Sequence, residues 1–143
     1  MPGRHEFEEE TSELRVRVEA PTRAELFEQA GRALAEAVVG GRGAEELAAL
    51  PAPEGPGEAV TLEGRDHEAL LVAWINELIF LTETQGRVYT DLRVEELGPA
   101  RLTAVIRGSA VPEGRTFVKA ATFHGLRIVD GPEGASVTVV LDV

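Results

Sequence analysis

Four stretches in which apolar and polar residues alternate follow one another from residue 87 onward. They read RVYTDLRVEEL (87–97), ARLTAVIRGSA (100–110), RTFVKAATFHGLRIVD (115–130) and ASVTVVLDV (135–143). Alternation with a period of two is typical of half-buried β-strands, and the Gly- and Pro-rich segments between the stretches are turn signals. The sequence therefore predicts a run of antiparallel strands whose apolar side must be covered by other elements.

Two helices are predicted before this run. The segment APTRAELFEQAGRALAEAVVG (20–40) places Thr22 and Glu25 at capping-box spacing and then repeats apolar residues at helical intervals. The segment HEALLVAWINELIFLTETQG (67–86) follows Asp66, a good N-cap residue, and ends at Gly86. Its apolar face is wider than that of an ordinary surface helix, so we expect it to be the central helix of the core, with Trp74 buried.

Shorter strands complete the pattern, SELRVRVE (12–19) before the first helix and EAVTLEG (58–64) before the second. The order strand, helix, strand, helix, and then several strands predicts an α+β fold. We expect a two-layer sandwich, with a mostly antiparallel sheet and two helices packed on one face. Because 143 residues are the size of one domain, residues 1–143 are predicted to form a single domain.

Composition excludes several kinds of chemistry. The sequence has no cysteine, which rules out disulfides, a thiol nucleophile and thiolate metal sites. A formal net charge of −11 disfavours direct binding to nucleic acid, because affinity for phosphates comes mainly from Lys and Arg. No apolar run approaches the roughly 18 residues that span a bilayer, and the start lacks the pattern of a signal peptide. We expect a cytoplasmic protein with no membrane partner.

Carboxylates are concentrated near the start of the sequence, where EFEEETSE (6–13) precedes a strand. A charged run of this kind is often only solvated, but paired carboxylates can also bind a hard cation or act as acid and base. Asp142 stands near the other end of the sequence, followed by Val143 and its α-carboxylate. If the first and last strands are neighbours, Glu13, Asp142 and Val143 could converge as oxygen ligands.

Neither the histidines nor the serines show a catalytic pattern. His5 and His67 are expected at the surface, and His124 is more readily explained as a structural residue than as a catalytic one. Because no serine stands in a nucleophile-elbow sequence, a hydrolase triad has no support.

Four blocks of the sequence resemble the archease family in the same order and across nearly the whole chain. They are FEEETSELRVRVEAPTRAELFEQAGRAL, EALLVAWINELIFLTETQG, FVKAATFHGLRIV and VVLDV. The family pattern is roughly E-H-T-A-D near the start, L-L-x-x-F-L-N-E-L-L-Y-L in the second helix, V-K-A-x-T-Y-H in a late strand, and L-D-I at the end. The matches in the second helix and at V-K-A-x-T-F-H are specific.

The resemblance implies a function and a set of site residues. Archeases are small accessory proteins that promote guanylylation and turnover of an RtcB-type RNA ligase in tRNA splicing and RNA repair. They have also been described as chaperone-like modulators of tRNA methylation, which implies a tRNA methyltransferase as a second partner. They bind a divalent cation, typically Ca²⁺, near the meeting of the chain ends, and that site falls on Glu13, Asp142 and Val143. Lys119 stands at the lysine of V-K-A, and the motif positions of Glu10 and His124 are assigned with it to activation of the partner.

The sequence departs from the pattern at the first motif, where EETSE replaces E-H-T-A-D. Glu10 stands at the histidine, and Glu13 stands at the aspartate with one methylene more. We therefore expect Ca²⁺ or Mg²⁺ to bind only weakly.

Two other interpretations stay open. One is a small metal-dependent hydrolase or phosphotransferase in which Glu13 and Asp142 hold Mg²⁺ and Lys119 offsets substrate charge. The other is a structural domain whose ancestral site has decayed.

Overall fold

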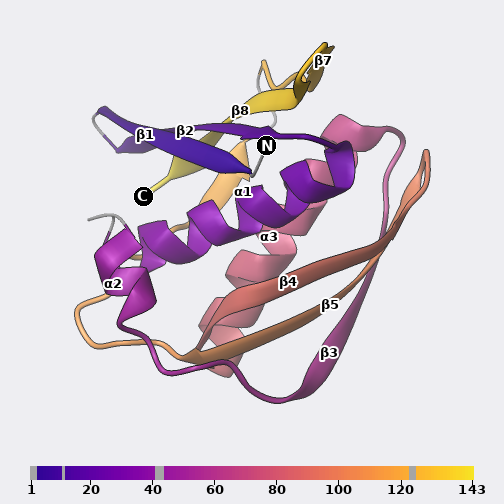
Figure 1. Cartoon of the computed structure of the whole chain (residues 1–143). Coiled ribbons are helices and arrows are strands. Elements are labelled where there is room, and N and C mark those ends of the chain that lie inside the picture. The colour runs from indigo at the N-terminus through magenta and orange to yellow at the C-terminus, as the bar shows by residue number, and fades with distance from the viewer. Residues whose placement is uncertain (1–2, 11, 41–43, 123–124) are drawn as a thin grey trace.

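The computed structural model describes residues 3–10, 12–40, 44–122 and 125–143. Within these residues the chain forms two long helices, one short helix and eight strands (Figure 1). The elements in chain order are β1 (Arg4–Glu10), β2 (Glu13–Ala20), α1 (Arg23–Val38), α2 (Ala44–Ala48), β3 (Glu54–Glu63), α3 (His67–Gln85), β4 (Arg87–Leu97), β5 (Arg101–Ala110), β6 (Ala120–Thr122), β7 (Val129–Gly131) and β8 (Gly134–Asp142).

The strands form two sheets. One sheet has the order β1-β2-β8-β6, with β7 also pairing with β8, and the other has the order β3-β5-β4. Every strand pair among the described residues is antiparallel. The predicted α+β class, with mostly antiparallel strands and two main helices, is therefore confirmed.

The layers are arranged differently from the predicted two-layer sandwich. Helix α1 contacts β2 on one side and β4 on the other, and α3 contacts β6 as well as β3 and β4. Figure 1 shows both helices between the two sheets. The wide apolar face of α3 explains this arrangement, because a helix that is apolar on more than one side needs cover on more than one side.

The helix boundaries follow local chemistry. The Thr22 hydroxyl accepts a hydrogen bond from Glu25 N at 3.1 Å, and the Asp66 carboxylate accepts one from Ala69 N at 2.8 Å, so both predicted N-caps are formed. Helix α3 ends at Gly86, which has a φ of 64° and donates from its backbone N–H to Thr82 O at 3.0 Å. Trp74 is fully buried, as predicted, and its Nε1–H donates to Phe27 O at 2.8 Å across the two helices.

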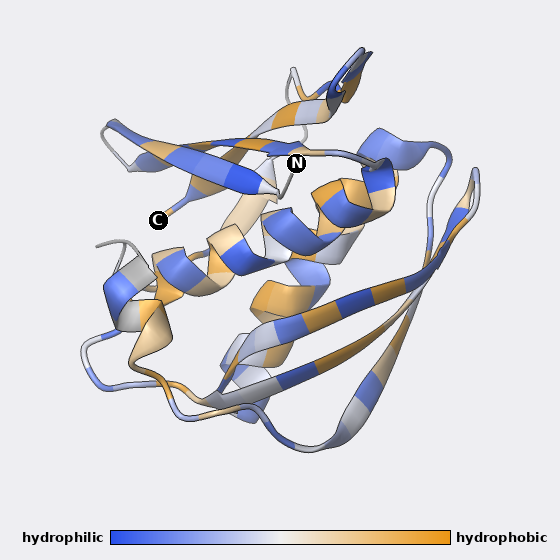
Figure 2. Cartoon of the chain, viewed as in Figure 1, coloured by the Kyte–Doolittle hydropathy of each residue, from blue (hydrophilic) through white to orange (hydrophobic). Residues whose placement is uncertain are grey.

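Strand β1 was not predicted. Residues 6–10 belong to the carboxylate run, and Figure 2 shows β1 as largely hydrophilic, so it carries little alternation to detect. As an edge strand it needs only one half-buried face, on which His5 and Phe7 lie. His5 is bound through one ring nitrogen to Glu36 and through the other to Gln29 at 2.8 Å, both on α1. The expectation of a surface His5 is therefore wrong.

The predicted long strand at 115–130 is also different in the structure. Among its described residues only β6 and the first two residues of β7 are strands, and Phe123 and His124 lie outside the described residues. Residues 116–119 are held instead by two single backbone hydrogen bonds, from Thr116 N to Val38 O at 2.9 Å and from Lys119 N to Asp142 O at 2.7 Å.

In the part of the chain that the structure describes, no helix is long and apolar enough to cross a membrane.

Candidate functional site

Glu13 and Asp142 face each other on neighbouring strands. They are register partners at the ends of β2 and β8, and both are half-buried. They lie on the side of the sheet away from the helices, because the buried residues of both strands alternate with them. Directly opposed residues of an antiparallel pair share a face, with Cβ atoms about 4.5–5.5 Å apart. Two carboxylates so placed repel each other unless a cation lies between them.

The backbone brings other predicted residues to the same end of the sheet. Glu10 is the register partner of Glu13 across the β1–β2 hairpin, and the structure does not describe its side chain. Val143 follows Asp142 and donates from its backbone N–H to Ser12 O at 3.1 Å. Ser12 has a φ of 61°, the left-handed conformation that allows the tight turn between β1 and β2. The predicted meeting of the first and last strands is therefore present.

A cavity of about 170 Å³ adjoins this end of the sheet. It is lined by Glu9, Glu13, Leu14, Ala37, Gly40, Thr116 and Val143. Thr116 lines the cavity but was not predicted as a site residue. Its sequence context gives no indication of a site, because only the folded structure brings residues 111–119 to this end of the sheet. Glu9 belongs to the carboxylate run, but only the register of β1 places it at the cavity.

Lys119 lies beside the carboxylate pair at the level of the backbone. Its N–H donates to the carbonyl of Asp142 at 2.7 Å, and Ala120, the next residue, is the register partner of Asp142. The side chain of Lys119 is exposed and forms no ion pair with any described residue. Lys119 is therefore a surface group and not a buried cation.

The donor set at this end fits a hard cation only in part. Carboxylate oxygens are the ligands that Ca²⁺ and Mg²⁺ prefer, and Glu13 and Asp142 supply two of them. Among the described residues no group of three or more His, Asp or Glu side chains is placed to hold a metal. His124 lies outside the described residues. His67 is not at this end of the sheet, because its ring accepts a hydrogen bond from Arg23 Nη1 at 2.9 Å and donates one to Gly98 O at 2.9 Å.

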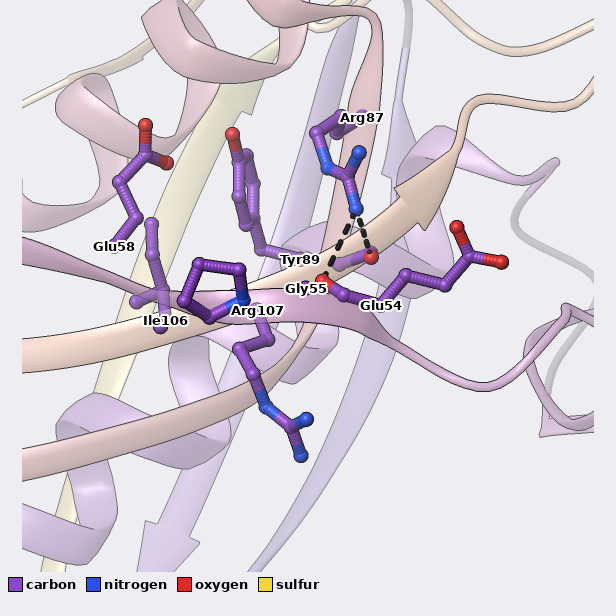
Figure 3. Close-up of a pocket in the computed structure, with 10 residues that line it drawn as sticks. Glu54, Gly55, Glu58, Arg87, Tyr89, Ile106 and Arg107 are labelled. Atoms are coloured by element: carbon purple, nitrogen blue, oxygen red, sulfur yellow. Dashed lines mark hydrogen bonds between the residues drawn. The ribbon is translucent and has the colours of Figure 1, made fainter.

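A second cavity, of about 440 Å³, lies in the other sheet, where the β3–β5 register shifts between Glu54 and Glu58 (Figure 3). Arg87 donates from Nη2 to Gly108 O at 2.5 Å and to Glu54 O at 3.5 Å. The Tyr89 hydroxyl is buried, and no hydrogen-bond partner is found for it among the described residues. Burial raises the pKa of Tyr89 to about 12, and the nearby Glu58 carboxylate adds to the shift.

Comparison with known proteins identifies the class to which this α+β fold belongs. Residues 5–143 match the family model described as the Archease protein family (MTH1598/TM1083). The chain is 30% identical to protein archease of Methanosarcina acetivorans, over 98% of this chain and 96% of the relative. It is 33% identical to protein archease of Thermococcus gammatolerans, over 92% of each chain.

Solved structures agree with the sequence comparison. The solution structure of Methanobacterium thermoautotrophicum protein 1598 has a TM-score of 0.72 and 25% identity, and covers 97% of this chain and 98% of its own. The crystal structure of the Thermotoga maritima archease, described as a "possible chaperone", has a TM-score of 0.65 at 19% identity, and shows the same fold over 95% of this chain and 94% of its own. The chain belongs to the archease family.

Proposed function

We propose that this protein is an accessory protein that activates an RtcB-type RNA ligase, promoting its guanylylation and turnover. The observation that carries the proposal is the juxtaposition of Glu13, Asp142 and Lys119 at one end of a sheet in a chain of the archease family. Glu13 is more than 100 residues from Lys119 and Asp142 in the sequence, and all three residues stand in the blocks that resemble the family.

Charge supports a protein partner over direct action on RNA. A net charge of −11 steers basic proteins toward this chain and RNA away from it. A ligase that binds RNA is basic at its RNA-binding surface, so the partner can hold the RNA while this protein contacts the ligase. A chaperone-like role toward a tRNA methyltransferase would use the same steering, and the Thermotoga relative is described as a "possible chaperone".

The proposed function includes a divalent cation that this protein would bind weakly. Glu13 and Asp142 would hold it, with Val143 beside them, and it would relieve the repulsion between the two carboxylates. Exposed Lys119 is left free to reach an acidic or phosphate-bearing group of the ligase or its nucleotide. We do not propose the hydrolase interpretation, since the relatives named above are described as archeases and none as a hydrolase.

Substitution of Lys119 tests the proposal. We expect Lys119→Ala to abolish stimulation of ligase guanylylation while leaving the fold intact. The side chain is exposed, and the hydrogen bond from Lys119 to Asp142 is made by the backbone N–H, which the substitution keeps. The assay is ligase turnover with wild type or variant added, together with a thermal melt of each. Arg127→Ala is the matched control, since it removes an exposed positive charge elsewhere.

Full stimulation by Lys119→Ala would remove this residue from the function. A melting temperature lowered by more than about 10 °C together with lost stimulation would assign Lys119 a structural role instead.

A further inference from the structure

Two phenylalanines are exposed close to a single ion pair. Phe80 on α3 is 58% exposed, and Phe117 in the segment between β5 and β6 is 62% exposed. Burying such a side chain is worth about 1.5–3 kcal/mol, so leaving two of them in water forgoes stability that the fold could have used. The other large hydrophobic side chain found exposed among the described residues is Val129.

Arg115 contacts both Phe117 and Glu83. Its Nη2 lies 2.8 Å from both carboxylate oxygens of Glu83, and its guanidinium carbon lies 3.9 Å from the centre of the Phe117 ring. Glu83 stands three residues after Phe80 on α3, so the two share a face of that helix. We call Phe80, Phe117 and the Arg115–Glu83 pair the aromatic patch.

The Phe117 side of the patch is held in place before any partner binds. Thr116 and Lys119 are each fixed by a backbone hydrogen bond, and Val118 between them is buried, at 3% exposure. In an extended segment neighbouring side chains point in opposite directions, so burial of Val118 turns Phe117 outward. An exposed aromatic group that is already ordered loses little entropy on binding.

The patch adjoins the candidate site, because Phe117 stands two residues before Lys119. Aromatic residues, phenylalanine included, and arginine are enriched in protein interfaces relative to the rest of the surface. The Arg115 charge is matched by Glu83, so the patch itself offers little net positive charge to RNA phosphates. The net charge of −11 favours a basic partner.

We propose that the aromatic patch is the docking surface for a basic protein partner. Phe80 and Phe117 would enter an apolar pocket of the partner, and this contact would bring the partner's active site to Lys119. This inference rests on the proposed function in taking that partner to be the RtcB-type ligase. It adds the surface that supplies affinity, separate from the charged groups that would act on the ligase.

The test measures binding of the purified ligase by calorimetry with wild type, Phe80→Ser, Phe117→Ser and Val129→Ser. We expect each phenylalanine variant to bind about tenfold more weakly or worse, with unchanged thermal melts because both side chains are exposed. Val129→Ser should bind like wild type, since Val129 pairs with Ser136 near the start of β8 while Lys119 lies at Asp142 near its end. Ligase stimulation is measured in parallel at limiting protein concentration.

Different outcomes overturn different statements. Wild-type affinity and stimulation in both phenylalanine variants would overturn the patch and leave the proposed function standing. Absence of any binding or stimulation by wild type would overturn both.

Two further measurements distinguish the proposed partner from other molecules that could bind the patch. Sedimentation that finds a wild-type dimer dissociated by Phe80→Ser or Phe117→Ser would assign the patch to a second copy of this chain. Binding of tRNA by the protein alone, lost in the same variants, would assign the patch to RNA. Either result would overturn the proposal.

Discussion

At the scale of single residues, Tyr89 offers a direct measurement, because it is the only tyrosine in the sequence. Burial raises its pKa to about 12, with a further contribution from Glu58. The unfolded chain releases the phenolic proton near pH 10. The stabilisation from the protonated phenol is therefore complete below about pH 10, and it is lost as the pH rises toward 12.

We expect the absorbance of tyrosinate in the folded protein to appear with a midpoint near pH 12, and near pH 10 in denaturant. Glu58→Gln should lower the folded midpoint without bringing it to the unfolded value, because burial is the larger cause. Coincident midpoints in the folded and unfolded protein would contradict the buried position of the hydroxyl.

Asp142 is the residue on which cation binding can be tested. Because the opposed pair Glu13 and Asp142 supplies only two side-chain carboxylates, we expect Ca²⁺ to bind with a dissociation constant of about 0.1–1 mM. Asp142→Ala should remove this binding in calorimetry. Glu8→Ala is the control, since Glu8 is an exposed carboxylate further along β1. Equal affinity in wild type and Asp142→Ala would exclude the proposed site.

At the scale of elements, α3 depends on Trp74 for its contact with α1. The side chain is fully buried, and its indole N–H satisfies the carbonyl of Phe27. We expect Trp74→Ala to lower the free energy of unfolding by about 3–5 kcal/mol, the range for removing a large core aromatic group. Chemical denaturation measures this, and a loss below about 1 kcal/mol would show that α3 packs differently.

The strands show which elements can be predicted from the local alternation of apolar and polar residues. The stretches at 87–97 and 100–110 appear as β4 and β5 with nearly the predicted bounds, because both alternate regularly and a Gly-Pro turn separates them. Strand β1 lacks such alternation and is specified by its pairing with β2. The stretch at 115–130 does alternate, but among its described residues only β6 and the start of β7 are strands, because pairing with β8 and not the local pattern decides which of them join the sheet.

At the scale of the whole molecule, Arg23 connects segments that are distant in sequence. From the start of α1 it donates to Asp130 on β7, at 3.1 Å from Nε and 2.6 Å from Nη2, and also to His67 at the start of α3. The hydrogen bonds from Arg23 hold the pKa of Asp130 below its usual value. A carboxyl with a lowered pKa stabilises the fold above the unfolded pKa of about 3.9, and this stabilisation is lost as the pH falls through the folded pKa.

We therefore expect Asp130→Asn to melt below wild type at pH 7. The difference should shrink as the pH falls below about 4, where the wild-type carboxyl is also neutral. Thermal melts of both proteins across this range provide the measurement. A difference that persists unchanged to the lowest pH would show that the ion pair is not its cause. The pair is exposed, so the difference should be small.

The sequence by itself determined the features that depend on neighbours within a few residues. The N-caps at Thr22 and Asp66, the end of α3 at Gly86 and the burial of Trp74 follow from side-chain hydrogen bonding, a left-handed glycine and helical spacing, all of which are local. Glu13 and Asp142 could be proposed as neighbours only on the condition that the first and last strands pair.

Tertiary structure decided the rest. It divided the strands into two sheets around the helices, made β1 a strand, set Glu13 opposite Asp142, and turned Phe117 outward beside Lys119. These features depend on register and on contacts between residues far apart in the chain, and a one-residue shift of register would exchange the faces of a strand. No local pattern carries that information, since the same alternation fits either register until the opposite strand and the covering helix are in place.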